Sequence, residues 1–297
     1  MLRINLMIKS FSVPKPTPTS SGGGLSSYCI ILNDICQEEN INLTWLSNNW
    51  LALLEKNGQR RFIMGYKFDL NSAIAAGIAD DKFATFDVLS NAKIPVVRHA
   101  LLYEPGNNAV CARGKNSLGY VQDFFIKHHE HIVIKPNNGT RGMNVHEISQ
   151  TADIEPALRE VFHQSYSASM CPFYQIKREY RLIMLDGEEK ISYYKERCND
   201  WRFNLGHGAI AYEITNEALH QKLLKIAQGA VRAIGLRFCS VDIIETTNHE
   251  LLVLEVNSGV MTRKFLSQYP ERHPDVYKMY HEAVKKMFAE SPDSMLK

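Results

Sequence analysis

The stretch that decides the fold is Ser240-Val-Asp-Ile-Ile-Glu-Thr-Thr-Asn-His-Glu-Leu-Leu-Val-Leu-Glu255-Val-Asn257. Two apolar runs flank a polar centre, which is the pattern of an antiparallel β-hairpin. A turn centred on Asn248 and His249 would pair the strands so that Asp242 lies directly opposite Glu255. The sequence therefore predicts two carboxylates that face each other across neighbouring strands.

Two facing carboxylates repel each other and weaken the strand pairing, and a bound divalent cation removes that cost. Asn257 lies on the same face as Glu255, because side chains alternate along a strand. Carboxylate and amide oxygens suit Mg²⁺, or Mn²⁺ in its place, on nucleotide phosphates rather than zinc. The alternative is that both acids lie at frayed strand ends in water. We expect a metal site made by Asp242, Glu255 and Asn257.

A second informative segment covers residues 131–145, H-I-V-I-K-P-N-N-G-T-R-G-M-N-V. It has the pattern of a strand, a polar loop and a further strand. Gly139 and Gly142 allow close backbone approach and positive φ, which leaves amide N–H groups free to bind anions. Lys135 ends a strand that is expected to be buried, where a cation needs a charged partner. An ordinary hairpin loop fits the same pattern, but a metal site downstream favours nucleotide phosphates as the ligand.

The composition of the 297 residues excludes several classes of protein. The chain has 34 Lys+Arg and 32 Asp+Glu, a formal net charge of +2 that is too small for non-specific nucleic-acid binding. A hydrophobic content of 45% excludes wholesale disorder. No apolar run approaches the ~20 residues of a membrane span, and six scattered cysteines without C-x-x-C indicate neither a zinc framework nor a secreted disulfide scaffold. We expect a cytoplasmic protein that binds neither nucleic acid nor membrane.

Helical and strand-like segments alternate near the start of the chain, with helices expected at 25–39 and 49–56 and strands at 42–46 and 62–66. This rhythm predicts a small open α/β sheet. Lys67 and Asn71, which follow it, either face substrate or lie in a surface loop. From residue 170 onward strands predominate around one long helix, an α+β arrangement.

With these segments together, the chain resembles the ATP-grasp superfamily, especially the branch of peptide-glutamate ligases and cyanophycin synthetases. The resemblance runs from Asp81-Lys82 through V-I-K-P-N-N-G-T-R-G-M-N-V, E-Y-R, W-R-F-N-L and S-V-D-I-I to L-E-V-N, roughly 180 residues in the family's order. It implies an ATP-grasp fold, in which two α+β subdomains clamp ATP, after a small open α/β N-terminal domain. The implied boundaries are 1–78 for that domain, 79–169 for the central subdomain with a phosphate flap, and 170–297 for the C-terminal subdomain with the Mg²⁺ site.

The resemblance also implies which residues hold ATP and Mg²⁺. The lysines and the flap that would hold the triphosphate are Lys82, Lys135, Gly139, Thr140, Arg141 and Gly142. The hinge whose backbone would contact adenine, and the acid that would bind the ribose, are Tyr174, Gln175, Ile176 and Glu179. The metal ligands implied by the family are Asp242, Glu255 and Asn257, the residues already expected from the hairpin.

Catalytic roles are implied for a further group of polar residues. Arg202 matches the arginine that stabilises the transferring phosphoryl group, and Asn204 lies beside it. Arg181 and Lys195 fall at positions that face the phosphates or the acyl substrate. His207 either acts as a base or only donates a hydrogen bond. With Lys135, the catalytic set expected is Arg202, Arg181 and His207.

The implied reaction is an ADP-forming ligation of a carboxylate to an amine, through an acyl phosphate. The acceptor expected is an amino acid or a peptide, and the chain is compatible with a monomer or a homo-oligomer. Two alternatives are an ATP-grasp kinase that phosphorylates a small molecule and a non-catalytic ATP-binding protein. The chain has Gly206-His207-Gly208 where peptide-glutamate ligases usually place an arginine, so the identity of the acceptor stays open.

Overall fold

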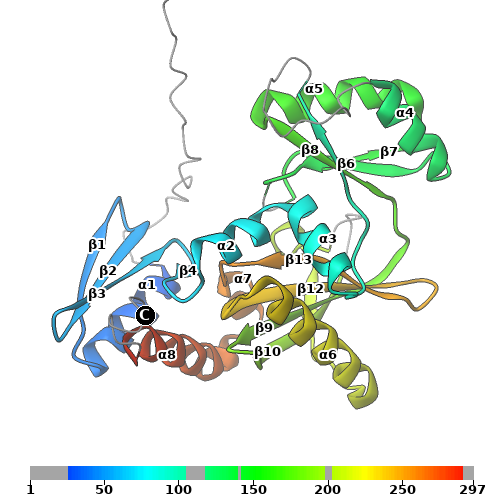
Figure 1. Cartoon of the computed structure of the whole chain (residues 1–297). Helices are drawn as coiled ribbons and strands as arrows, with labels where there is room; N and C mark the ends of the chain where they lie inside the picture. Colours follow the sequence, from blue (N-terminus) through cyan, green and yellow to red (C-terminus); the bar gives the residue numbers. More distant parts are fainter. Residues whose placement is uncertain (1–25, 105–117, 140–141, 198–202, 290–297) are drawn as a thin grey trace, which may run out of the picture.

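The computed structural model describes residues 26–104, 118–139, 142–197 and 203–289. These residues form three antiparallel sheets, each covered by helices (Figure 1). In the described segments no helix combines the length and apolar character needed to cross a membrane.

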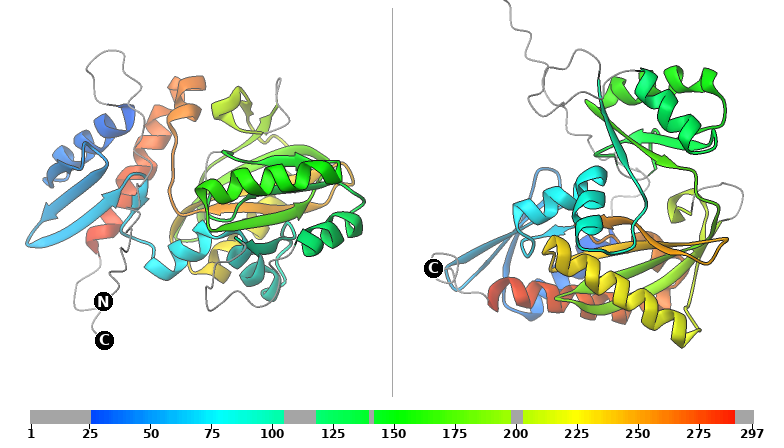
Figure 2. Two further views of the ribbon diagram at one scale, coloured as in Figure 1. Left: turned by 90° about the horizontal axis from the view of Figure 1, so that it is seen from above. Right: turned by 45° about the vertical axis from the view of Figure 1, so that its right-hand side comes forward.

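The N-terminal sheet has the order β1-β2-β3-β4 and is a simple meander. Its strands are β1 (Asn42–Leu46), β2 (Leu51–Lys56), β3 (Gln59–Met64) and β4 (Lys67–Phe68). It packs against α1 (Ser27–Glu38), whose Ser26 N-cap accepts a hydrogen bond from Cys29 N–H. On its other side α1 contacts α8 (His273–Ala289), which seen from above lies between this sheet and the rest of the chain (Figure 2).

The helix predicted over 49–56 is wrong, because Leu51–Lys56 forms strand β2. Its residues Leu, Ala, Glu and Lys favour helix locally, but pairing with β1 and β3 on both sides buries Ala52 and Leu54. The turn before it places Ser47, Asn48 and Asn49 at positive φ, which reverses the chain into a hairpin.

The central unit is a sheet of order β5-β8-β6-β7 covered on one face by two helices. Its elements are β5 (Ala100–Tyr103), α4 (Leu118–Lys127), β6 (Ile132–Pro136), β7 (His146–Ile148), a 3₁₀ turn (Thr151–Asp153), α5 (Ile154–Gln164) and β8 (Ser167–Pro172). Ile132 and Ile134 of β6 pack under α4 and α5. Val133 and Lys135 alternate with them and therefore lie on the opposite face.

The C-terminal unit is a five-stranded sheet of order β11-β10-β9-β12-β13. Its strands are β9 (Ile176–Leu185), β10 (Glu188–Glu196), β11 (Ile210–Tyr212), β12 (Phe238–Thr246) and β13 (Leu251–Asn257). One face packs on α6 (Glu217–Ile234), α2 (Ala73–Asp80) and α3 (Lys82–Asn91). On the other face Ile183 and Phe238 pack with α1, α8 and α7 (Arg263–Gln268). Two 3₁₀ turns, Leu205–His207 and Pro270–Arg272, complete the unit.

The central sheet faces the C-terminal sheet, with α4 and α5 on the side away from it (Figure 1). Val133 and Cys171 of the central sheet share an apolar cluster with Ile244 of β12, so the two inner faces touch. Val96 forms a parallel bridge with Val253 at the crossing between the units.

The predicted pairing of Asp242 with Glu255 is confirmed in the β12–β13 hairpin. Nearer the turn the register is shifted by one residue, since Ile243 pairs with Val253. Leu254 is therefore an extra residue, a β-bulge that restores the predicted register at the far end. No bulge separates Glu255 from Asn257, which keeps them on one face.

Asn71 is not a plain surface loop residue, because its amide holds two segments together. Its Oδ1 accepts from the N–H groups of Arg237 (2.8 Å) and Phe238 (3.1 Å). Its Nδ2 donates to the carbonyls of Phe238 (2.7 Å) and Ser258 (3.5 Å). The polar segment after β4 thus anchors the N-terminal sheet to the start of β12.

Candidate nucleotide and metal site

The predicted lysines, arginines and acids that the structure describes lie on the two facing sheets and on the first turn of α3. From the central sheet comes Lys135, and from the C-terminal sheet come the charged side chains of β9, β10, β12 and β13. Lys82 begins α3, whose N-cap Asp81 accepts from Ala84 N–H. Residues far apart in sequence are therefore brought to one region.

A buried charge network crosses three strands at the middle of the C-terminal sheet. Arg181 donates twice to Asp242, from Nε to Oδ1 (2.8 Å) and from Nη2 to Oδ2 (2.6 Å). Lys195 Nζ donates to Asp242 Oδ1 (3.0 Å) and also to Glu179. Strand register explains the network, because Asp242 lies beside Arg181, and Lys195 beside Glu179. Only 2% of Asp242 and 3% of Lys195 are exposed, so these charges depend on one another.

The network determines the protonation state of its acids. Burial by itself would raise the pKa of Asp242, but the charges of Arg181 and Lys195 outweigh burial and hold that pKa well below its ordinary value. For Glu179 burial dominates and raises the pKa, and Lys195 opposes the rise. Asp242 is therefore firmly ionised, and Glu179 depends on Lys195 for its charge.

Asp242 has no lone pair to spare in this arrangement. A carboxylate has about four acceptor positions, and Asn257 Nδ2 donates the fourth hydrogen bond, to Oδ2 (3.2 Å). Glu255 makes no hydrogen bond or ion pair with any described residue. The donor set fits a hard cation, provided that the Asn257 amide turns its oxygen inward and frees one position on Asp242. In the described part of the chain no three His, Cys, Asp or Glu side chains cluster to hold a metal, and the predicted ligand set contains only two carboxylates beside the Asn257 amide.

The two predicted phosphate lysines differ in environment. Lys82 Nζ donates to the carbonyls of Gly139 (2.6 Å) and Asn137 (3.3 Å), which ties α3 to the loop after β6. Burial, with a smaller contribution from Lys135, lowers the pKa of Lys82 to about 8, and the charge of Glu255 opposes this shift. Lys135 is 9% exposed and lies opposite Ser169 of β8.

The two predicted flap glycines serve different purposes. Gly142 has φ of +69°, the left-handed conformation that glycine adopts easily. Gly139 has an ordinary φ, but a Cβ there would lie 3.0 Å from the Pro136 side chain, so its constraint is close packing. Thr140 and Arg141, between them, lie outside the described residues.

The predicted hinge joins the two sheets between β8 and β9. Tyr174 accepts a hydrogen bond from Arg98 N–H (3.3 Å), and Gln175 O accepts one from Thr247 N–H (2.9 Å). Tyr174 and Ile176 pack on the apolar cluster between the sheets. Its other members, which the sequence did not single out, are Val97, Val133, Val145, Cys171, Phe173, Ile244, Leu252 and Leu254. Alternation along β6 and β8 was the available signal for Val133 and Cys171.

The remaining predicted residues are only partly described. Arg202 lies outside the described residues. The backbone of His207 ends the 3₁₀ turn Leu205–His207. Asn204 caps that turn, because its Oδ1 accepts from Gly206 N–H (2.7 Å).

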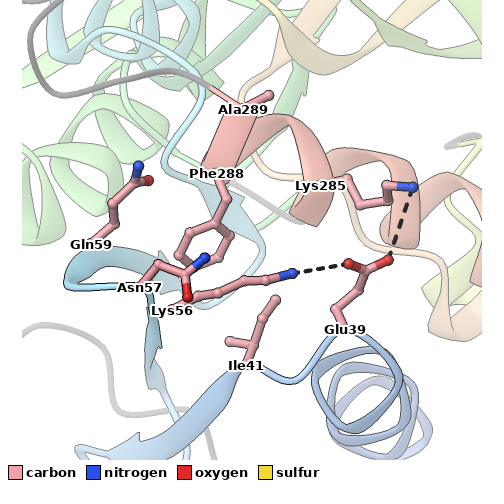
Figure 3. A pocket seen from close by; sticks show the side chains of 8 residues that line it. All are labelled: Glu39, Ile41, Lys56, Asn57, Gln59, Lys285, Phe288 and Ala289. Atoms are coloured by element: carbon pink, nitrogen blue, oxygen red, sulfur yellow. Dashed lines mark hydrogen bonds and ion pairs between the residues drawn. The ribbon is translucent and has the colours of Figure 1, made fainter.

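A separate hollow of about 240 Å³ lies between the N-terminal sheet and α8 (Figure 3). Lys56 and Lys285 both reach Glu39, at 3.1 Å and 3.9 Å, so their charges are largely compensated (Figure 3). It contains none of the predicted site residues.

Comparison with known proteins identifies a matching family and several solved structures with a similar fold. The RimK-like ATP-grasp domain model matches residues 79–270. D-alanine–D-alanine ligase from Bacillus anthracis superposes with a TM-score of 0.57 and 16% identity, over 74% of this chain and 72% of that one. The same ligase complexed with ATP gives a TM-score of 0.56 and 15% identity, over 74% and 71%. D-cycloserine synthetase DcsG superposes with a TM-score of 0.53 and 20% identity, over 70% of each chain. No curated protein matches significantly in sequence.

The predicted ATP-grasp fold is confirmed by the family match and by these superpositions. The family match also confirms the predicted class of enzyme, an ATP-grasp ligase. It does not distinguish the branch of peptide-glutamate ligases from others.

Proposed function

Because the chain belongs to the RimK-like ATP-grasp domain family, we propose that it joins a carboxylate substrate to an amino acid or peptide through an acyl phosphate. Membership of this family supports, in general, the ATP-dependent joining of a carboxylate to an amine.

One observation supports the proposal most directly. Asp242 is buried and ionised beside Glu255, a carboxylate without a described protein partner. The Glu255 charge is close enough to Lys82 to influence its pKa. Acids that favour a cation and lysines that favour phosphate therefore meet at one place, as Mg²⁺-bound ATP requires.

Asp242, Glu255 and Asn257 would hold Mg²⁺, or Mn²⁺. The ion would neutralise charge on the β- and γ-phosphates. Glu255 is free to act as a ligand at once. Asn257 has to release Asp242 and turn its amide, so metal binding and the network around Asp242 are coupled.

The residues of the chain supply positioning and charge. Lys82 and Lys135 bind the phosphates, and Arg202 stabilises the transferring phosphoryl group. A carboxylate oxygen of the substrate attacks the γ-phosphorus, the bond to the leaving ADP oxygen breaks, and an acyl phosphate forms. The amine nitrogen then attacks the acyl carbon and loses a proton, and inorganic phosphate leaves. His207 forms a hydrogen bond with the incoming amine. No side chain of the enzyme acts as a covalent nucleophile.

The network around Asp242 gives Arg181 and Lys195 a supporting role in this scheme. Arg181 is bound through two hydrogen bonds to Asp242, and Lys195 is shared by Asp242 and Glu179. Both cations orient the metal-binding carboxylate before ligands arrive. When the Asn257 amide turns, they keep Asp242 ionised and in place.

The test is ADP release by purified protein with Mg²⁺, ATP and panels of amino acids and short peptides. Release that needs both a carboxylate and an amine supports ligation. A stable phosphorylated product without an amine would indicate a kinase. Tight Mg–ATP binding without turnover would indicate a binding protein.

Glu255→Gln tests the metal assignment in the same assay. We expect ADP release to fall by about 10²-fold or more, because one oxygen ligand loses its charge. Glu250→Gln, an exposed acid at the other end of the hairpin, is the matched control and should leave the rate unchanged. ADP release by Glu255→Gln at the wild-type rate would refute the assignment.

A further inference from the structure

His99 is a buried polar side chain on the inner face of the central sheet that no role above uses. It precedes β5, is 4% exposed, and its Nδ1 lies 2.6 Å from Ser169 Oγ. The ring meets Phe86 of α3 edge-on, with centroids 6.4 Å apart. Its Nε2 has no hydrogen-bond partner among the described residues.

Nε2 is nevertheless not sealed inside the protein. The enclosed side-chain nitrogen and oxygen atoms that lack a partner in the described chain are those of Tyr28, Gln59, His128, Asn144 and His146, and His99 is not among them. A buried polar atom without a partner costs free energy unless it is paired. An atom that keeps some access is placed to bond a ligand that enters between the sheets.

The two charges of the described residues that act on His99 are both positive. Lys135 on β6 lies across from Ser169, the residue that holds His99 Nδ1, and Lys82 on α3 is the second cation. Burial first, and then these two lysines, lower the pKa of His99 well below its ordinary value. Ser169 of β8 and Phe86 of α3 carry no charge, and among the described residues no acid contributes to the pKa of the ring. In the free protein the ring is therefore neutral.

Two lysines act on a ring that is bonded to Ser169, the cross-strand neighbour of Lys135, and whose Nε2 has no partner among the described residues. An anion with several oxygens suits both the positive charges and the imidazole nitrogen. We propose that His99 is a nucleotide-contacting residue, whose Nε2 bonds an oxygen of the bound phosphate chain and whose ring takes up a proton from solvent as the nucleotide binds. The inference rests on the proposed function, which places the triphosphate between Lys82 and Lys135.

Proton uptake follows from the change of field at the ring. Without ligand the two lysines oppose the imidazolium. The phosphate chain carries several negative charges, so its arrival reverses the sign of the field and favours the protonated ring. With both nitrogens protonated, Nδ1 donates to Ser169 Oγ and Nε2 donates to the phosphate oxygen. The proton returns to solvent when product leaves.

The test is titration calorimetry of Mg²⁺ and a non-hydrolysable ATP analogue at about pH 7, in two buffers of different ionisation enthalpy. The difference in heat gives the number of protons taken up. We compare wild type with His99→Gln, which keeps a polar group near Nε2 but cannot be protonated. His99→Asn keeps a group that can bond Ser169 but has nothing at Nε2. His163→Gln, an exposed histidine on α5, is the control.

Wild type and His163→Gln should take up roughly half a proton to one proton more than His99→Gln, because only they keep a ring at position 99 that can be protonated. Protonation of the analogue itself is the same in all variants and cancels in the comparison. His99→Asn should bind the analogue about tenfold more weakly, as expected for loss of a hydrogen bond to a charged group. Thermal unfolding of both variants shows whether they fold.

Equal proton uptake and affinity in wild type, His99→Gln and His99→Asn would overturn the role of His99 and leave the proposed function intact. Variants that differ from wild type only in thermal stability would do the same, since they would show a purely structural His99–Ser169 bond. If wild type bound no nucleotide at all, the proposed function would fail together with this inference.

Discussion

Replacing Lys195 by Met tests whether the buried charges of the C-terminal sheet stabilise the fold only because each is paired with an opposite charge. Lys195 is 3% exposed and donates to both Glu179 and Asp242. Methionine fills similar space without charge. Asp242 keeps Arg181 and Asn257, whereas Glu179 is 8% exposed and loses its cation.

Removing one partner of a buried ion pair costs about 3–5 kcal/mol, because the other charge is left uncompensated. We expect the free energy of unfolding of Lys195→Met to fall by about that amount near neutral pH. Lys195→Met with Glu179→Gln should recover half or more of the loss, since the double variant no longer buries a bare charge. Lys222→Met, on the exposed side of α6, should change stability by less than about 0.5 kcal/mol.

The pH dependence gives the result its sign. Burial already raises the pKa of Glu179 above the ordinary value of 4.5, and losing Lys195 removes the main opposing charge. A carboxyl with a raised pKa in the folded state favours folding at low pH and loses that advantage as pH rises past its unfolded pKa. Stability of Lys195→Met should therefore fall from about pH 5 to about pH 7.5, by up to about 1.4 kcal/mol per pH unit.

Denaturant unfolding followed by circular dichroism, on ligand-free protein at both pH values, measures these quantities. The double variant should lack the added pH dependence. A loss of less than about 1 kcal/mol in Lys195→Met, or the absence of rescue by Glu179→Gln, would show that these buried charges do not depend on one another.

Two further predictions concern Lys82 and Asn71. Burial lowers the pKa of Lys82 to about 8, so its charge is present below that pH and is lost above it. Affinity for Mg–ATP, measured by calorimetry, should therefore weaken above about pH 8 in wild type. Lys82→Gln should bind Mg–ATP weakly, and its affinity should change less with pH. If the affinity of Lys82→Gln changed with pH as much as that of wild type, this prediction would be contradicted. Asn71→Ala leaves backbone groups at the start of β12 without their hydrogen-bond partner. The variant should therefore lower the free energy of unfolding by about 2–4 kcal/mol and leave the ADP-release rate per folded molecule unchanged. A slower rate in a variant of full stability would instead place Asn71 at the substrate.

The sequence predicted local features where a short-range rule applied. Apolar runs around a polar centre predicted the β12–β13 hairpin, and period-two alternation put Glu255 and Asn257 on one face. The pairing of Asp242 with Glu255 is present, although the bulge at Leu254, which shifts the register next to the turn, was not predicted. A bulge depends on how both strands pack, which alternation does not encode.

Tertiary contacts outweigh the local preference of the chain in two segments. Residues 51–56 have helix-forming side chains, yet strand pairing on both sides makes them β2. Asn71 appeared as a loop or substrate residue, yet its four backbone hydrogen bonds join segments about 170 residues apart. Such bonds form between partners that only the folded chain brings together.

For the site, the sequence by itself determined which residue types gather: acids on a hairpin, lysines and glycines near a strand end, and the order that identifies the family. Only the tertiary structure decided how they are paired. Asp242 accepts four hydrogen bonds, Glu255 accepts none from the described residues, and the charges of two lysines act on His99. The physical reason is that protonation and ligand binding depend on burial and on the nearest charges in space, which residue type and spacing along the chain do not specify.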